Sequence, residues 1–314
     1  MKKKSFKILM LGGGKRVSLA RRFKDTISTL NFLPQIYSYD LTKNEPIAKE
    51  AIIIEGSPWN SNKIIPNLRE KILQYNFDLI ISNVDPALLI QNILANQFKS
   101  AAIVSSYESI MICQSKDLFQ EFCENHKLPI IPRWDNKTFP FFIKPKNGSS
   151  SIGAKLVHSI DQINNDIYLK DDSYIKQMFI DGYEYTVDIY VDRNKKIKAL
   201  SPRERLKTAG GEVVLTKTFR DKIIEDLSEK IIYKLGLKGP ISIQFIKSRI
   251  DNKLFVMEIN PRLGGGVIAS IEAGHDIPKM LISDILEHDI KKSSLKTNLI
   301  MKRYFEEIFY EDHS

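Results

Sequence analysis

Cysteine is scarce in this chain, because Cys113 and Cys123 are the only two among 314 residues. Two thiols allow one disulfide but no disulfide framework, so we expect a reducing, cytoplasmic location. The five histidines stand singly and no residues have zinc-ligand spacing, which argues against a histidine-based metal site. No apolar run approaches the roughly 20 residues of a membrane span, so no membrane partner is expected.

Charge of one sign is not concentrated in any segment. The net charge is +9, but lysines are spread along the chain and acidic residues are interleaved with them. This pattern favours a solvated surface with a few cations for anionic ligands over a nucleic-acid partner. The apolar run after the basic start, 8–11, is too short for a signal-peptide core and predicts a first buried strand.

Alternating segments in the first third of the chain predict a parallel, doubly wound α/β sheet. Gly12, Gly13 and Gly14 follow the first strand and Asp40 ends the second, which resembles a dinucleotide-binding opening. Val17 breaks the G-x-G-x-x-G spacing, so a tight strand-to-helix turn is the preferred interpretation and NAD binding the alternative. The expected strands are 6–11, 35–40, 51–54, 78–82 and 101–104, and the expected helices are 15–30, 62–76 and 85–98.

A loop of small residues follows an aromatic-rich strand that ends near Lys144. Backbone N–H groups and hydroxyls in such a loop can fold over phosphates, and the lysine can neutralise them. The P-loop pattern G-x-x-x-x-G-K-[ST] is absent, and a plain turn is the alternative. The loop residues that we single out are Gly148, Ser149, Ser150, Ser151 and Gly153.

Residues 174–191 predict a strand pair joined at Asp181 and Gly182. Amides of the hinge beside Met178 and Phe179 can read an adenine edge, and Glu184 can accept ribose hydroxyls. An edge hairpin with a surface glutamate is the alternative interpretation.

The most specific pattern is a second predicted hairpin with a polar turn centred on Asp251. Glu258 and Asn260 are two residues apart and share a strand face, and this turn places Gln244 opposite Glu258. A carboxylate and two amide oxygens suit Mg²⁺, which takes phosphate oxygens as further ligands. Arg262 follows closely enough to reach a transferring phosphoryl group. The alternative is a solvated strand end followed by an ordinary Asn-Pro turn.

The order of these pieces resembles the ATP-grasp superfamily, and within it carbamoyl-phosphate-synthase-like and pyrrolysine-biosynthesis-ligase-like members. The resemblance is carried by Lys116-Asp117 at a helix start, the strand lysine with its Gly/Ser loop, the hinge strand with Glu184, and Gln…Glu-x-Asn-Pro-Arg. It implies a Rossmann-like pre-ATP-grasp domain over 1–105, a small subdomain with the ATP lid over 106–175, and an α+β large subdomain over 176–314 that ends in a helix.

The resemblance also implies a role for each residue of the site. Gln177 stands where the family commonly has Glu, and serines stand in the loop where glycines are frequent. By this resemblance, the ATP phosphates are contacted by Lys116, Lys144 and the loop from Gly148 to Gly153. The adenine pocket is formed by Gln177, Met178, Phe179 and Ile180, and Glu184 binds the ribose. Two Mg²⁺ ions, with Mn²⁺ as the alternative, are held by Gln244, Glu258 and Asn260, and Arg262 contacts the acyl phosphate.

The implied activity is that of an ATP-dependent carboxylate–amine ligase, which forms an acyl phosphate and releases ADP and phosphate. Small-molecule carboxylate and amine substrates are the expected partners, and a homodimer is left open. On the acceptor side, Arg203 or Arg205 can hold a substrate carboxylate, with a solvated loop as the alternative; we take Arg205 and Arg262 as the candidate catalytic residues. The alternative functions are carbamoyl-phosphate-synthase-like phosphorylation of bicarbonate or carbamate, and a non-catalytic ATP-binding regulator.

Overall fold

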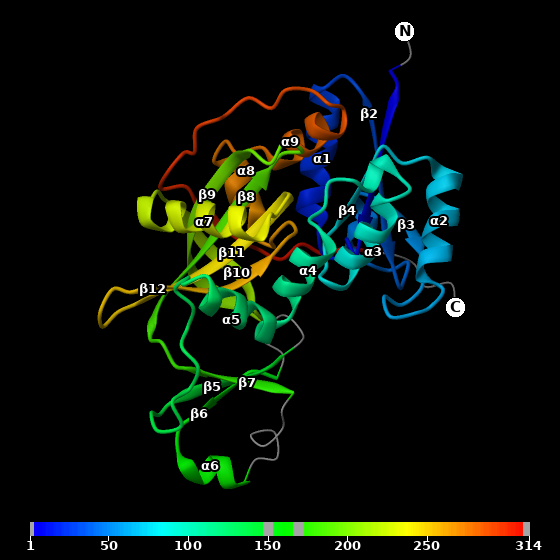
Figure 1. Cartoon of the computed structure of the whole chain (residues 1–314). Coiled ribbons are helices and arrows are strands. Elements are labelled where there is room, and N and C mark those ends of the chain that lie inside the picture. Colours follow the sequence, from blue (N-terminus) through cyan, green and yellow to red (C-terminus); the bar gives the residue numbers. More distant parts are fainter. Residues whose placement is uncertain (1–2, 147–152, 166–172, 310–314) are drawn as a thin grey trace.

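The computed structural model describes residues 3–146, 153–165 and 173–309. Its N-terminal lobe is a parallel sheet with helices on both faces, in the strand order β3-β2-β1-β4 (Figure 1). The strands are β1 (Ser5–Leu11), β2 (Leu33–Asp40), β3 (Ile52–Glu55) and β4 (Leu79–Ser82), and the helices are α1 (Val17–Thr29), η1 (Pro46–Lys49), α2 (Ile64–Tyr75), α3 (Pro86–Ala95) and η2 (Lys99–Ala101).

Side chains along β1 alternate between two buried faces. Ile8 and Met10 join the apolar cluster that contains α1, whereas Leu9 and Leu11 join the cluster of α2 and α3. Burial on both faces follows from covering a parallel sheet with helices on each side. The doubly wound sheet expected from the sequence is therefore confirmed.

One expected strand of this lobe, 101–104, is wrong. The segment contains the end of η2 and then has no regular structure. The side-chain amide of Gln91 donates to the carbonyls of Ala101 and Ile103, each at 3.2 Å, and to Ile80 at 3.0 Å. A buried side chain thus satisfies backbone groups that a fifth strand would have paired with β4.

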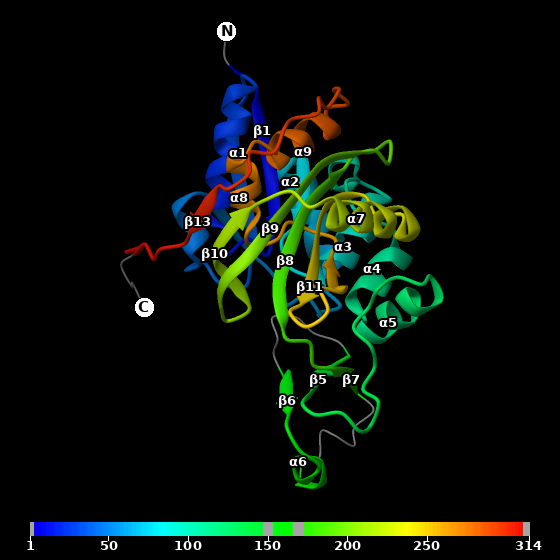
Figure 2. The same cartoon turned by 90° about the vertical axis from the view of Figure 1, so that its left-hand side faces the viewer.

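A six-stranded antiparallel sheet forms the centre of the rest of the chain, in the order β12-β11-β8-β9-β10-β13 (Figure 2). Val187, Ile189 and Ile243 point to one face, where they share a core with α5 and α7. The alternate residues Asp188 and Ser242 point to the other face, toward the loop that precedes α8. The strands are β8 (Gly182–Val191), β9 (Ile197–Ala209), β10 (Glu212–Thr218), β11 (Gly239–Ser248), β12 (Leu254–Asn260) and β13 (Ile300–Lys302), and the helices are α4 (Tyr107–Gln114), α5 (Lys116–Asn125), α7 (Lys222–Leu235), α8 (Val267–Glu272) and α9 (Ile277–Ile285).

A small antiparallel sheet projects away from the other two (Figures 1 and 2). Its order is β6-β5-β7, and Phe141, Ile143 and Val157 form its own small core. No helix among the described residues is long and apolar enough to span a membrane. The elements are β5 (Phe141–Pro145), β6 (Lys155–Val157), α6 (Ile160–Asn165) and β7 (Tyr174–Met178).

The expected hairpin over residues 174–191 is wrong, because its two strands belong to different sheets. β7 pairs with β5, whereas β8 lies between β9 and β11. The next strand, β9, pairs with one edge of β8 and the distant strand β11 with the other, so no edge is left for β7. The segment 179–181 is consequently a link between the small and large sheets, and not a tight turn.

The expected C-terminal helix is also wrong. Residues 303–309 have no helical structure, and the Phe305 side chain is 99% exposed. One charged side chain of this segment, Glu306, contacts Arg21 and Lys49 of the N-terminal lobe. We call residues 303–309 the C-terminal strap.

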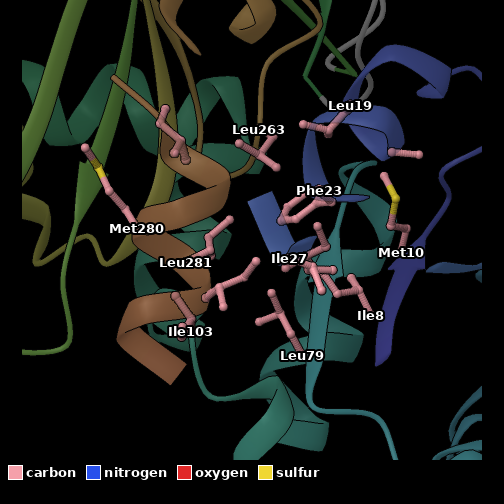
Figure 3. Close-up of a cluster of buried hydrophobic side chains, with 14 of the residues drawn as sticks. Ile8, Met10, Leu19, Phe23, Ile27, Leu79, Ile103, Leu263, Met280 and Leu281 are labelled. Carbon is pink, nitrogen blue, oxygen red and sulfur yellow. The ribbon is translucent and has the colours of Figure 1, made fainter. Parts of the chain in front are cut away.

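One apolar cluster joins the N-terminal lobe to the large sheet. Phe23 and Ile27 of α1 pack in it together with Met280 and Leu281 of α9 (Figure 3). α5 packs by Phe119 against the core of the large sheet, and β7 lies wholly in the small sheet. We therefore propose 133–178 as the extent of the small subdomain, in place of the 106–175 expected from the sequence.

Candidate nucleotide and metal site

A cleft of about 1300 Å³ lies where the N-terminal lobe, the small sheet and the large sheet meet. The proposed residues Gly148, Ser149, Ser150 and Ser151 lie outside the described residues, and Gly153 packs beside the Pro145 ring and is not part of the lining. All the other proposed residues line the cleft: Lys116, Lys144, Gln177, Met178, Phe179, Ile180, Glu184, Arg205, Gln244, Glu258, Asn260 and Arg262.

Three side chains of the β11–β12 hairpin meet at the cleft wall, in the register that the sequence predicted. Gln244 pairs with Glu258 across the strands, and a bulge at Met257 shifts the register at this point. The Gln244 Nε2 atom donates to Glu258 Oε1 at 2.6 Å, and Asn260 Nδ2 donates to the same oxygen at 3.1 Å. Without the bulge, the register of Phe245 with Val256 would place Met257 opposite Gln244. The irregularity thus selects which side chains face the cleft.

The side-chain oxygen atoms of Gln244, Glu258 and Asn260 suit a hard cation that has further oxygen ligands from elsewhere. One carboxylate and two amide oxygens are too few to enclose an ion by themselves. Within the described ranges, no group of three or more His, Cys, Asp or Glu side chains has metal-binding geometry. Magnesium commonly binds through one or two carboxylates plus substrate phosphates, so these residues fit that ion if a phosphorylated ligand is present.

Two lysines face this trio from the opposite wall. Lys116 is the first residue of α5, and its backbone N–H donates to the carbonyl of Lys146. Burial lowers the pKa of Lys144; the carboxylate of Glu258 opposes this shift, and the positive charge of Lys116 adds to it. Burial likewise lowers the pKa of Lys116, with Glu258 and Asp85 opposing. Lys116 and Lys144 repel each other and share one nearby carboxylate, so binding of a polyanion between them is favourable.

The link between the two sheets offers backbone groups to a planar ligand. The Met178 N–H donates to the carbonyl of Pro132, and the Asp181 carbonyl accepts from Arg249. Between them, Phe179 and Ile180 have no backbone hydrogen bond to any described residue, and both line the cleft. Such free groups at a strand end can pair with the edge of a base.

Gln177 is committed to another side chain. It is 5% exposed, and its Nε2 atom donates to Gln120 Oε1 at 2.8 Å. Gln120 in turn donates to the carbonyl of Ile131 at 3.2 Å. The amide of Gln177 is therefore held from within the protein at the cleft wall, and Gln120 is a member of that wall which the sequence did not suggest.

Arg205 lies beside Glu184 in the wall of the cleft. Its Nε atom donates to Glu184 Oε2 at 3.0 Å, and its Nη2 atom donates to the carbonyl of Gly211 at 3.2 Å. We therefore propose that Arg205 orients Glu184, and its catalytic role stays a prediction.

Arg262 is held by a carboxylate of the N-terminal lobe. Its Nε and Nη2 atoms donate to the two oxygens of Asp85 at 2.7 and 2.8 Å, and Nη2 also reaches Asn260 Oδ1 at 3.2 Å. Asp85 precedes Pro86, the first residue of α3. A two-point arginine–carboxylate pair fixes the plane of the guanidinium, so Asp85 orients Arg262 beside the metal trio. The only signal for Asp85 in the sequence was an Asp-Pro pair after a buried strand.

A buried ion pair lies under the glycines that follow Arg262. Arg203 is 2% exposed, and its Nε atom donates to Asp188 at 2.8 Å. Ser270 donates to the same carboxylate at 2.7 Å. A Cβ atom on Gly266 would lie 2.6 Å from the Arg203 guanidinium carbon, so glycine is required for this close approach. Arg203, which the sequence offered as an alternative to Arg205, keeps an Nη1 atom with no partner in the described structure.

The glycine turn after β1 is tied to its own lobe. The Gly14 N–H donates to Asp40 Oδ1 at 3.1 Å, and Ser38 donates to the other oxygen at 2.5 Å. Gly12 has a φ of 71°, which side-chain-bearing residues rarely adopt. The Asp40 carboxylate therefore holds the turn, in agreement with the structural interpretation of these glycines.

Comparison with known proteins agrees with this geometry. Residues 171–306 match the family model described as ATP-grasp in the biosynthetic pathway with Ter operon. The fold resembles that of N5-carboxyaminoimidazole synthetase from Staphylococcus aureus, solved with ADP, at a TM-score of 0.76 and 17% identity, over 96% of this chain and 83% of that one. The solved structure shows the fold, and residues 171–306 carry the ATP-grasp match.

Two curated relatives extend the comparison. Tyramine–L-glutamate ligase of Methanocaldococcus jannaschii is 26% identical over 67% of this chain and 65% of its own length. The large chain of carbamoyl phosphate synthase from Methanothermobacter thermautotrophicus is 26% identical over 61% of this chain and 22% of its own length. Residues 171–306 thus match an ATP-grasp family model, and the chain is similar to the large chain of carbamoyl phosphate synthase. It spans less than two thirds of the length of either relative.

Proposed function

We propose that this protein is an ATP-dependent carboxylate–amine ligase that forms an acyl phosphate and releases ADP and phosphate. The observation that carries the proposal is the convergence of Lys116, Lys144 and Glu258 in one cleft, with the amides of Gln244 and Asn260 beside the carboxylate. These residues provide charge neutralisation and positioning, which phosphoryl transfer requires, and they need no nucleophilic side chain.

Each step has residues suited to it. A carboxylate oxygen of the first substrate bonds to the γ-phosphorus of ATP, and ADP leaves. The amine of the second substrate then attacks the acyl carbon, and phosphate leaves with that carboxylate oxygen. Lys116 and Lys144 would neutralise the phosphates, and Arg262, oriented by Asp85, would stabilise the transferring group.

Glu258, Gln244 and Asn260 would hold two divalent ions, Mg²⁺ or Mn²⁺. When bound, such ions supply charge neutralisation at the phosphate oxygens. The backbone of Phe179 and Ile180 would pair with the adenine edge, and Glu184 would accept the ribose hydroxyls. Because Gln177 already donates to Gln120, adenine selection in this proposal depends on the backbone more than on that side chain.

An isotope experiment tests the proposal. The protein is incubated with MgATP and pooled amines, together with amino acids and organic acids whose carboxylates carry heavy oxygen. We expect ADP, a condensed product found by mass, and one heavy oxygen in the released phosphate, because the carboxylate oxygen leaves with it. An unlabelled phosphate alongside a condensed product would contradict the acyl-phosphate route.

The likeness to the carbamoyl phosphate synthase large chain supports a second candidate, the phosphorylation of bicarbonate or carbamate. The same assay separates it, because bicarbonate alone would then stimulate ADP release without any organic acid. Tight MgATP binding with no ADP in any mixture would instead favour a non-catalytic regulator.

A further inference from the structure

Beyond Arg262 the cleft continues into a compartment built by three distant segments. Arg16 precedes α1, Glu212 begins β10, and Arg303 begins the C-terminal strap. Arg16 Nη1 lies 3.3 Å from Glu212 Oε1, and Arg303 Nη1 lies 2.7 Å from Glu212 Oε2. Arg303 also donates to the carbonyl of Gly265. We call Arg16, Glu212, Gly265 and Arg303 the arginine compartment; all four line the cleft.

The compartment holds more positive than negative charge. Three arginines, with Arg262 included, share the two carboxylates of Glu212 and Asp85. Burial lowers the pKa of Arg16; Glu212 opposes this shift, while the neighbouring Arg262 and Arg303 add to it. An arginine that is buried beside two like charges is unfavourable unless a further anion joins it.

Unused hydrogen-bond donors give a second and independent indication. The Arg16 side chain is 17% exposed, and Nη1 is its only guanidinium nitrogen with an acceptor among the described residues. Nearby, the Nη1 atom of Arg203 is buried without a partner below Gly266. A guanidinium offers its N–H groups as a planar fork, whose natural complement is a carboxylate.

We propose that the arginine compartment binds a carboxylate of the organic substrate, separate from the carboxylate that is phosphorylated. This inference rests on the proposed ligase function and names its substrate class: small acids or amino acids with a second carboxylate. Residues 262 and 265 are three positions apart, so their Cα atoms are separated by at most about 11 Å. Arg262 lies at the metal trio and Gly265 in the compartment, which limits the substrate to a short molecule.

The test measures binding to the full chain by thermal shift in saturating MgADP, at constant ionic strength. The probes are malonate, succinate, glutarate, aspartate and glutamate, each matched with the amide that has one carboxylate fewer: malonamate, succinamate, glutaramate, asparagine and glutamine. We expect at least one dicarboxylate to stabilise the protein and its matched amide not to do so. Arg16→Gln should weaken that binding about 10- to 100-fold, the value of one or two lost charge-assisted hydrogen bonds, and leave MgADP affinity unchanged.

Two further variants make the result decisive. Arg303→Gln changes a side chain that is 35% exposed, so it preserves the fold even if Arg16→Gln does not, and it should show the same loss. Arg220→Gln, a surface arginine paired with Glu225, is the matched control and should bind as the wild type does.

The inference is overturned if amides stabilise as well as dicarboxylates, if no dicarboxylate shifts the wild type, or if both variants keep wild-type affinity. Failure of the ligase proposal is a different result, since the isotope experiment would then give no condensed product, or a condensed product with unlabelled phosphate, whether or not MgADP and a dicarboxylate bind. Stabilisation by a dicarboxylate that is lost in Arg303→Gln would support the compartment even in that case.

Discussion

Replacing Glu258 by glutamine removes one charge from the centre of the cleft and keeps the shape of the side chain. The carboxylate accepts hydrogen bonds from Gln244 at 2.6 Å and from Asn260 at 3.1 Å, and it opposes the lowering of the lysine pKa values across the cleft. Both bonds go to Oε1, and the amide oxygen of glutamine can still accept them with its two lone pairs. Glutamine cannot supply an anionic oxygen to a metal ion, and its amide donors would face two cations.

The expected effect on turnover is large. Losing a preorganised electrostatic contact to a transferring phosphoryl group costs about 3–4 kcal/mol. At 1.36 kcal/mol for each factor of ten, ADP formation by Glu258→Gln should be slower by roughly 10²- to 10³-fold. Stability should change by less than about 1 kcal/mol, because Glu258 is only half-buried and the amide preserves the hydrogen bonds.

Steady-state ADP release and thermal unfolding, measured on the same preparations, check both expectations. Asp251→Asn is the matched control: it is an acid-to-amide change in the exposed turn of the same hairpin, where Asp251 pairs with Lys253. It should behave as the wild type in both assays. A folded Glu258→Gln protein with turnover within threefold of the wild type would refute the assignment of this carboxylate.

Three other expectations follow from the same structure. Burial lowers the pKa of Lys144 below its ordinary value of 10.5, so the ammonium loses its proton at a lower pH and MgATP affinity should fall as pH rises through that range; titrations at neutral and alkaline pH check this, and Lys144→Arg should make the fall smaller, since Lys116, whose pKa is also lowered, remains. Gly266→Ala places a Cβ atom 2.6 Å from the Arg203 guanidinium carbon and should destabilise the protein by about 1–3 kcal/mol in thermal unfolding, whereas Gly210→Asn, with no atom within 4 Å of the added Cβ and a φ of 55° that Asn tolerates best among side-chain-bearing residues, should cost less. Burial raises the pKa of Cys123 to about 12, so this thiol should react with a disulfide reagent only on unfolding; rapid labelling of the native protein would contradict this.

The sequence predicted well where a signal was local. Gln244, Glu258 and Asn260 lie on one hairpin, and strand periodicity together with a polar turn was enough to place them side by side. The first four strands of the N-terminal lobe followed from alternating apolar runs in the same way. In each case the sequence pattern that identifies the hairpin or the strand lies within a short stretch of the chain.

Interactions between distant residues were not predictable. Arg16 and Glu212 are 196 positions apart, and Arg303 and Glu212 are 91 apart, so no spacing rule connects them. The hairpin expected near Asp181 failed because β8 is paired on both edges by strands that come later in the sequence. Arg205 was assigned by residue type alone, and only the register of β9 with β8 brings it to Glu184.

The apolar cluster shared by α1 and α9 determines whether the two lobes can be separated or exchanged. Phe23, Ile27 and Leu281 are fully buried in it, and exposing each would cost about 1.5–3 kcal/mol. Cutting the polypeptide after residue 105 would therefore expose apolar surface on both fragments, and each fragment would be prone to aggregate. A chimera that exchanges the first lobe must also bring a complementary α9 surface. Because the two lobes share this core, neither lobe can be replaced without the other.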